Sequence, residues 1–124
     1  MISQDRLDIK KEIQQNVYRS LHSLALEMKT LDEILKILEQ QRDFIRDKYK
    51  VKEIGIFGSY VRGEAKKTSD VDILVEFEKT PSLLKFIELE NYLSDTLGVK
   101  VDLVEKKGLK PRIGKYILQE VVML

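Results

Sequence analysis

Two carboxylates on alternate residues follow a glycine–serine pair at a short distance. Gly58 and Ser59 are followed by ten residues and then by Asp70-Val71-Asp72. Side chains alternate along a strand, so Asp70 and Asp72 should share one face. Two carboxylates this close repel each other unless a cation lies between them. Mg²⁺ prefers carboxylate oxygens and leaves coordination positions for water and substrate phosphates, so the pair indicates a divalent metal site.

A third carboxylate, Asp102, stands in a second short apolar run. It alternates with Val101 and Leu103, which places it on the face opposite the apolar side chains. Three carboxylates can hold two metal ions about 3.5–4 Å apart, the arrangement that assists phosphoryl transfer. We therefore predict Asp70, Asp72 and Asp102 as metal ligands and catalytic residues, with two Mg²⁺ ions.

The glycine–serine pair suits the phosphates of a nucleotide. Gly58 lets the backbone approach a ligand closely, and N–H groups at a helix start, together with the Ser59 hydroxyl, can cradle phosphate oxygens. Arg62 could add a charge-assisted contact to phosphate. It could equally pair with Glu64 or Asp70 and brace the loop, and the residue types alone leave both readings open.

Periodicity and capping signals predict the elements that position these residues. Thr30 and Glu33 fit a capping box, and the apolar stripe behind them predicts a helix over 31–49. Thr80 suits an N-cap and Pro81 the first helical turn, with Gly98 ending that helix after about Thr96. Strands are expected at 51–57, 71–78 and 99–104, a short helix at 59–63, and a closing helix at 111–122. Expected core positions of the helix before Gly98 are Leu84, Ile87, Leu93 and Leu97.

This order predicts an α/β (α+β) fold, a small sheet with helices on one face and the three aspartates on the other. The 124 residues suit one domain with a modest core. We assign residues 29–124 to that domain and residues 1–28 to an N-terminal helical extension. Met28 stands directly before the capped helix, so residues 1–27 can be an upstream addition.

Composition excludes several classes of protein. The net charge of +1 provides no overall basic field, so direct nucleic-acid binding is not expected. No apolar run is long enough to span a bilayer, and the N-terminus lacks a signal-peptide core. Cysteine is absent, which fits a reducing compartment. We expect a cytoplasmic protein without a membrane partner.

The spacing carries a family resemblance. The stretch GSYVRGEAKKTSDVDILVEF resembles the minimal nucleotidyltransferases, the MNT group of the DNA polymerase beta-like nucleotidyltransferase superfamily, over about residues 30–124. The resemblance implies a mixed sheet with flanking helices. It implies that Asp70 and Asp72 bind Mg²⁺, that Asp102 is the third carboxylate, and that Gly58 and Ser59 hold the triphosphate of ATP. Arg62 and Ser69 complete the candidate nucleotide-binding residues.

Many MNT proteins are similar to antitoxins paired with a HEPN-domain ribonuclease toxin. The resemblance implies a HEPN toxin as partner, transfer of AMP from ATP to a tyrosine of that toxin, and an oligomer with it. One alternative is a module that inhibits its partner by occlusion, with 1–28 or the apolar tail 121–124 as its surface, although burial of the tail is favoured. Another is transfer to a small molecule or an RNA end. That last reading would use a basic rim of Lys66, Lys67, Lys106, Lys107, Lys110 and Arg112.

Overall fold

The computed structural model describes residues 28–124 and contains a four-stranded mixed sheet in the order β3-β2-β1-β4. The strands are β1 (Val51–Phe57), β2 (Val71–Phe77), β3 (Val101–Glu105) and β4 (Val122–Met123). β2 and β3 run parallel, whereas β1 is antiparallel to both β2 and β4. The mixed sheet was expected from the family resemblance and is confirmed. The predicted helical extension falls, except for Met28, outside the described residues.

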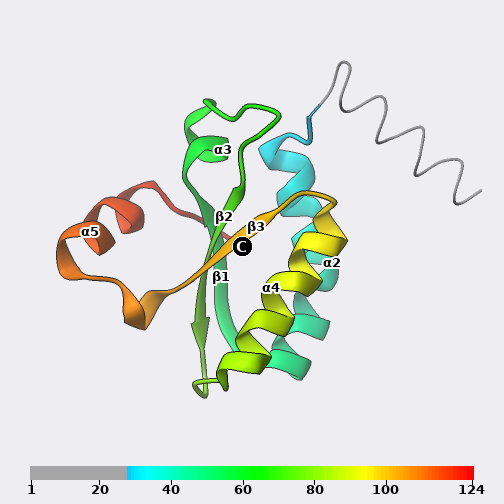
Figure 1. Cartoon of the computed structure of the whole chain (residues 1–124), viewed down its shortest axis with the longest axis vertical. Coiled ribbons are helices and arrows are strands. Elements are labelled where there is room, and N and C mark those ends of the chain that lie inside the picture. The colour runs from blue at the N-terminus through cyan, green and yellow to red at the C-terminus, as the bar shows by residue number, and fades with distance from the viewer. Residues whose placement is uncertain (1–27) are drawn as a thin grey trace, which may run out of the picture.

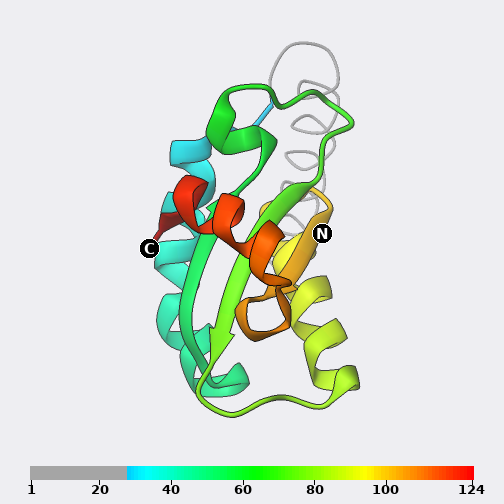
Figure 2. The ribbon, with the colours of Figure 1, turned by 90° about the vertical axis from the view of Figure 1, so that its left-hand side faces the viewer.

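Two helices cover one face of this sheet. α2 (Leu31–Tyr49) and α4 (Leu83–Leu97) lie side by side against it (Figure 1). α5 (Pro111–Glu120) lies on the other side and crosses in front of the strands in Figure 2. The short helices are α3 (Ser59–Arg62), directly after β1, and the 3₁₀ turn η1 (Lys106–Gly108). The main core forms under α2 and α4 from apolar side chains that include Ile34, Leu38, Ile56, Ile73, Val75, Leu89, Leu93 and Leu97.

The bounds of α2 match the prediction because both ends carry local stop signals. The Thr30 hydroxyl accepts a hydrogen bond from the Glu33 N–H at 3.2 Å, which satisfies one free donor of the first turn. At the other end, Lys50 adopts a left-handed conformation with φ 57° and donates its N–H to Arg46. Such a residue closes a helix by satisfying a carbonyl of the last turn.

The start and the buried side of α4 differ from the prediction. The N-cap is Ser82, whose hydroxyl accepts from the Lys85 N–H at 3.2 Å, so Thr80 and Pro81 precede the helix instead of opening it. Leu84 and Ile87, expected in the core, are 81% and 41% exposed. They lie five and two positions before Leu89, which at about 100° per residue turns them away from the buried stripe. Leu93 and Leu97 are buried as expected.

The C-terminal segment forms the edge of the sheet. α5 ends at Glu120, two residues before the predicted end, because Val121 is extended (φ −60°, ψ 136°) and leads into β4. β4 pairs with β1, with Met123 opposite Gly55. A Cβ at Gly55 would lie 2.6 Å from Met123 Sδ. The absence of a side chain at Gly55 therefore lets β4 pack closely against β1. The tail therefore docks at the edge of the sheet, but it is not buried as expected, since Val121, Val122 and Leu124 are partly buried and Met123 is exposed.

Two strands also shift slightly against the prediction. β2 ends at Phe77 instead of Glu78, and β3 covers Val101–Glu105 instead of 99–104. The alternation within β3 is as expected, since Val101 and Leu103 are buried and Asp102 is exposed. None of the helices formed by residues 28–124 has the length and apolar character that crossing a membrane requires.

Candidate active site

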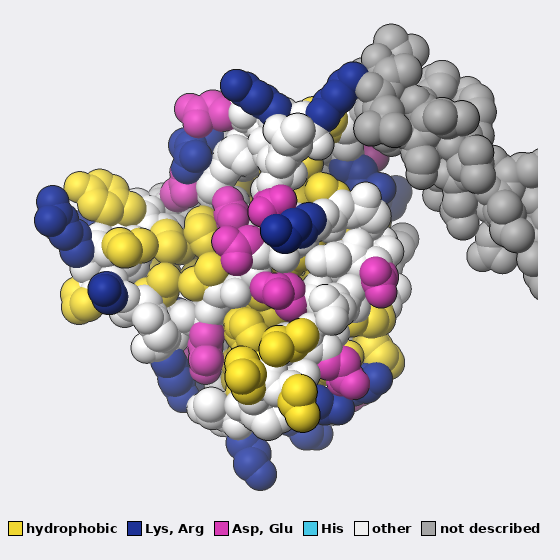
Figure 3. Space-filling view, viewed as in Figure 1, with side chains coloured by type: hydrophobic (Ala, Val, Ile, Leu, Met, Phe, Trp, Pro, Cys, Tyr) yellow, Lys and Arg dark blue, Asp and Glu magenta, His cyan; other side chains and the backbone are white. Residues whose placement is uncertain are grey.

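Three aspartates meet where β2 and β3 begin. Asp72 and Asp102 are Cα partners across the parallel pair, and Asp70 immediately precedes β2. Side chains of paired positions project to the same face, so the register places Asp72 beside Asp102. A joint site of all three aspartates stays a prediction. Figure 3 shows acidic side chains gathered below the position of α3, near the centre of the view.

Asp72 lies in a position that disfavours its negative charge. Burial raises the pKa of its carboxyl, and the charges of Asp102 and Asp70 raise it further, while Arg62 opposes them. The ammonium of Lys100 lies 3.8 Å from Asp70 Oδ2 and partly offsets the negative charge. The site therefore concentrates negative charge around a half-buried carboxylate.

The chemistry of these residues fits Mg²⁺, although they do not form a complete cage. Within residues 28–124, no group of three His, Cys, Asp or Glu side chains is arranged to hold a metal ion. Mg²⁺ typically takes one or two carboxylates and completes its shell with water and phosphate oxygens. Burial raises the pKa of Asp72, and the charges of Asp102 and Asp70 add to the shift; a cation would relieve the repulsion from these two charges. Two Mg²⁺ ions held by Asp70, Asp72 and Asp102 remain a prediction.

Gly58 is required by the position of Asp72. Its backbone has φ 82° and ψ −153°, a region that is essentially restricted to glycine. A Cβ at Gly58 would lie 2.1 Å from Asp72 Oδ2. The glycine therefore allows the carboxylate of Asp72 to lie directly against the turn that was predicted to hold phosphate.

Arg62 and Gly58 share one anionic partner, the carboxylate of Glu120 at the end of α5. The Gly58 N–H donates to Glu120 Oε2 at 3.0 Å, and Arg62 Nη1 donates to Glu120 Oε1 at 2.6 Å. Arg62 Nε also pairs with Glu64 at 3.0 Å, so the bracing alternative is present through Glu64 and not through Asp70. Hydrogen bonds from Arg62 and then from Gly58 lower the pKa of Glu120 despite some burial.

The two candidate serines occupy different positions. Ser59 is half-buried at the start of α3, and its carbonyl accepts from the Glu64 N–H at 2.9 Å. Ser69 closes the loop before β2, because its hydroxyl accepts from the Lys66 N–H at 2.8 Å and its own N–H donates to Lys66. Phosphate binding by Ser59, Ser69 and Arg62 stays a prediction.

Glu120 is the site residue that sequence reasoning missed. It contacts Gly58 and Arg62 across 62 and 58 positions of the chain, a separation that no local pattern reveals. One signal was present. A carboxylate in the last turn of a helix interacts unfavourably with the helix dipole. Glu120 at the end of α5 therefore indicates that hydrogen-bond donors or cations elsewhere in the fold stabilise its negative charge.

Comparison with known proteins identifies the family of this chain. The model of the nucleotidyltransferase domain family matches residues 38–124. The protein adenylyltransferase MntA of Thermococcus cleftensis is 61% identical over 95 residues, which are 77% of this chain and 96% of that protein.

Solved structures show the same fold. A protein assigned as a minimal nucleotidyltransferase superimposes with a TM-score of 0.68 at 34% identity, covering 77% of this chain and 97% of its own. A toxin–antitoxin structure with AMP-PNP gives a TM-score of 0.60 at 29% identity, covering 73% of this chain and 70% of that chain. The chain therefore belongs to the nucleotidyltransferase domain family of enzymes.

Proposed function

We propose that this protein is a Mg²⁺-dependent adenylyltransferase that moves AMP from ATP to a tyrosine hydroxyl of a HEPN toxin and so acts as its antitoxin. The observation that carries the proposal is the register of Asp72 opposite Asp102, with Gly58 directly against Asp72. This arrangement supports the proposal because it brings the carboxylates close to the turn that we predict to hold phosphate.

The chain's own groups bind and orient the nucleotide. Asp70, Asp72 and Asp102 would hold Mg²⁺, which when bound neutralises charge on the triphosphate and on the leaving pyrophosphate. The Gly58 N–H and the Arg62 guanidinium would hold phosphate oxygens, since both already bind an anion, the Glu120 carboxylate. Nucleotide binding therefore requires that these two donors exchange Glu120 for phosphate.

The transfer joins the acceptor oxygen to the α-phosphorus. The phenol oxygen of the acceptor forms a bond to that phosphorus while the bond between the α-phosphorus and the oxygen bridging to the β-phosphate breaks, and pyrophosphate leaves. Asp102 is exposed, in contrast to the half-buried Asp72, so its carboxylate is placed to meet an incoming acceptor and take the phenolic proton. Arg62 would remain on the leaving pyrophosphate and stabilise its charge.

A protein acceptor agrees with the exposed surface and with the relatives. Large hydrophobic side chains stand exposed on α4, at Leu83 and Leu84, and on α5, at Ile113 and Tyr116. Exposed apolar groups of this kind often mark protein interaction sites. The similar protein adenylyltransferase and the similar toxin–antitoxin structure with AMP-PNP support a toxin as that partner.

Neutralisation of the toxin in cells tests the proposal against inhibition by binding alone. The protein is co-expressed with its toxin as wild type, as Asp70→Asn, as Asp72→Asn, and as Asp95→Asn, a control at an exposed position on α4. We expect the control to protect growth and both site variants to fail while still co-purifying with the toxin. Full protection by both site variants would mean that occlusion, without chemistry, inhibits the toxin.

A further inference from the structure

Tyr116 is the one tyrosine of residues 28–124 whose side chain is largely exposed. It is 70% exposed on α5, whereas Tyr49 and Tyr60 are 3% and 9% exposed. Tyr92 is partly buried, and its hydroxyl donates to the side-chain carbonyl of Gln41. Tyr116 therefore presents a phenol hydroxyl to solvent, the kind of group that the proposed reaction uses as its acceptor.

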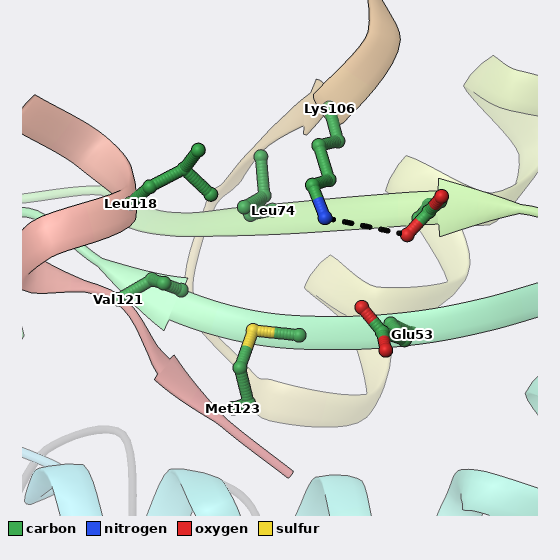
Figure 4. A pocket seen from close by; sticks show the side chains of 7 residues that line it. Glu53, Leu74, Lys106, Leu118, Val121 and Met123 are labelled. Atoms are coloured by element: carbon green, nitrogen blue, oxygen red, sulfur yellow. Dashed lines mark ion pairs between the residues drawn. The ribbon is translucent and has the colours of Figure 1, made fainter. Parts of the chain in front are cut away.

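α5 crosses the sheet and divides one of its faces into two parts. The helix follows β3 and η1 in the chain and leads into β4, so it runs from one edge of the sheet to the other (Figure 2). Asp72, Leu74 and Glu76 project from the same face of β2. Leu74 is only 2% exposed and lies beside Leu118 of α5 in Figure 4. Asp72 therefore lies along one flank of α5, and Glu76 lies along the other.

The flank of α5 that faces Asp72 carries Glu120 and Tyr116. Glu120 accepts from the Gly58 N–H at 3.0 Å, and Gly58 lies directly against Asp72, so Glu120 marks this flank. At about 100° per residue, Tyr116 lies about 40° around the helix from Glu120, whereas Leu118 lies about 160° away. Leu118 accordingly lines a pocket of about 220 Å³ on the opposite flank, and Tyr116 stands on the flank of the aspartates.

One helical turn separates Tyr116 from Glu120, in the direction of the strand that carries Asp102. Residues four apart on a helix have Cβ atoms about 5–6 Å apart, and α5 runs back from Glu120 toward the β3 edge. The carboxylate of Glu120 already reaches the turn at Gly58. Because a tyrosine side chain is longer than that of glutamate, the Tyr116 hydroxyl can reach from the same flank into the space above the aspartates.

We propose that, without its toxin, the protein transfers AMP to the hydroxyl of its own Tyr116, within one molecule. The phenol oxygen forms a bond to the α-phosphorus of a bound nucleoside triphosphate, the bond from that phosphorus to the oxygen bridging to the β-phosphate breaks, and pyrophosphate leaves. The phenolic proton passes to the carboxylate of Asp102. This inference rests on the proposed function, because it uses the same site and adds an acceptor inside the chain.

Labelling of the purified protein without toxin tests the inference. The full chain is incubated with Mg²⁺ and ATP labelled on the α-phosphate, and the modified residue is mapped by mass spectrometry. Tyr116→Phe keeps the aromatic ring but has no acceptor oxygen. The control is Tyr92→Phe, on α4, which covers the opposite face of the sheet (Figure 1). Wild-type protein is also labelled together with its toxin, and circular dichroism verifies that each variant is folded.

We expect label on Tyr116 in the wild type and in the control, and complete loss of label in Tyr116→Phe. The rate constant for labelling should not change with protein concentration, because the acceptor and the site belong to one molecule. A mixture of Asp72→Asn with Tyr116→Phe should also stay unlabelled, since neither chain then contains both the intact site and the acceptor.

Two results would overturn the inference and leave the proposed function standing. They are label on a different residue of the wild-type chain, and no label on the chain under conditions in which the toxin is labelled. Label on Asp72→Asn in the mixture would show transfer between molecules and would overturn the intramolecular step. If wild-type protein labelled neither itself nor its toxin, the proposed function itself would fail.

Discussion

Replacement of Gly58 by alanine should damage the protein in a way that depends on Asp72. Alanine would have to adopt φ 82° and ψ −153°, a conformation that costs about 1–3 kcal/mol for a residue with a side chain. Its Cβ would also lie 2.1 Å from Asp72 Oδ2 and 3.0 Å from Asp72 Cγ. The aspartate must therefore leave its position, and overpacking of this kind costs about 1–3 kcal/mol more.

Gly63 provides a matched control five residues away. It also has a positive φ of 71°, but a Cβ built on it meets no atom within 4 Å. Gly63→Ala should therefore lose only the left-handed backbone term, about 1–2 kcal/mol. We expect Gly58→Ala to lower the free energy of unfolding by about 2–6 kcal/mol, more than the control.

A double-mutant cycle separates the backbone cost from the clash with Asp72. The free energy of unfolding of each variant is measured by urea titration in the presence of chelator, with circular dichroism as the signal. In the background of Asp72→Ala the two shortest contacts, to Oδ2 and Cγ, are removed and only the Cβ contact at 3.3 Å stays. The cost of Gly58→Ala should therefore fall by about 1–3 kcal/mol. Gly63→Ala should be additive with Asp72→Ala, since the two positions share no contact. If Gly58→Ala cost no more than Gly63→Ala and were also additive with Asp72→Ala, the contact between the turn and the carboxylate would be refuted.

Three further predictions follow from the charges of the molecule. Asp72→Asn should raise the free energy of unfolding of metal-free protein at pH 7, because it removes a charge that burial, Asp102 and Asp70 disfavour; lower stability in chelator would contradict this. Glu120→Gln should tighten tripolyphosphate binding, measured by calorimetry with Mg²⁺, because Arg62 and the Gly58 N–H lose a competing anion; weaker binding would instead make Glu120 a residue that positions these donors. Burial, with the neighbouring Glu88, raises the pKa of Tyr49 to about 12 from 10.0. Between these values the folded state keeps a proton that the unfolded chain releases, so the free energy of unfolding should fall as pH rises from about 10 to 12. Tyr49→Phe should abolish the part of this loss of stability that comes from Tyr49, which urea midpoints measured across this pH range would show. An unchanged loss of stability in the variant would exclude Tyr49 as its source.

Elements with strong local signals could be predicted from the sequence. The Thr30 cap and the apolar stripe defined α2, and the alternation around Asp72 defined β2. The grouping of Asp72 with Asp102 followed from alternation and the family resemblance, and the strand register supports it. In each of these cases a short stretch of chain carries the physical cause of the structure.

Features that depend on tertiary contacts could not be predicted in this way. Leu84 and Ile87 belong to the apolar pattern of α4, but this helix packs through the stripe that contains Leu89, and both side chains point away from that stripe and are exposed. Thr80 and Pro81 were predicted to open that helix, but the hydroxyl of Ser82 caps it. Glu120 reaches the site only because β4 pairs with β1 and brings the end of α5 beside Gly58.

Transfer of the α-phosphate tests the central proposal most directly. The purified protein and its toxin are incubated with Mg²⁺ and with ATP labelled on either the α- or the γ-phosphate, and the labelled residue is mapped by mass spectrometry. The proposal predicts that α-label, and not γ-label, appears on a toxin tyrosine, and that chelator or Asp72→Asn prevents it. Absence of α-label on a toxin that the protein nevertheless neutralises would contradict adenylylation as its function.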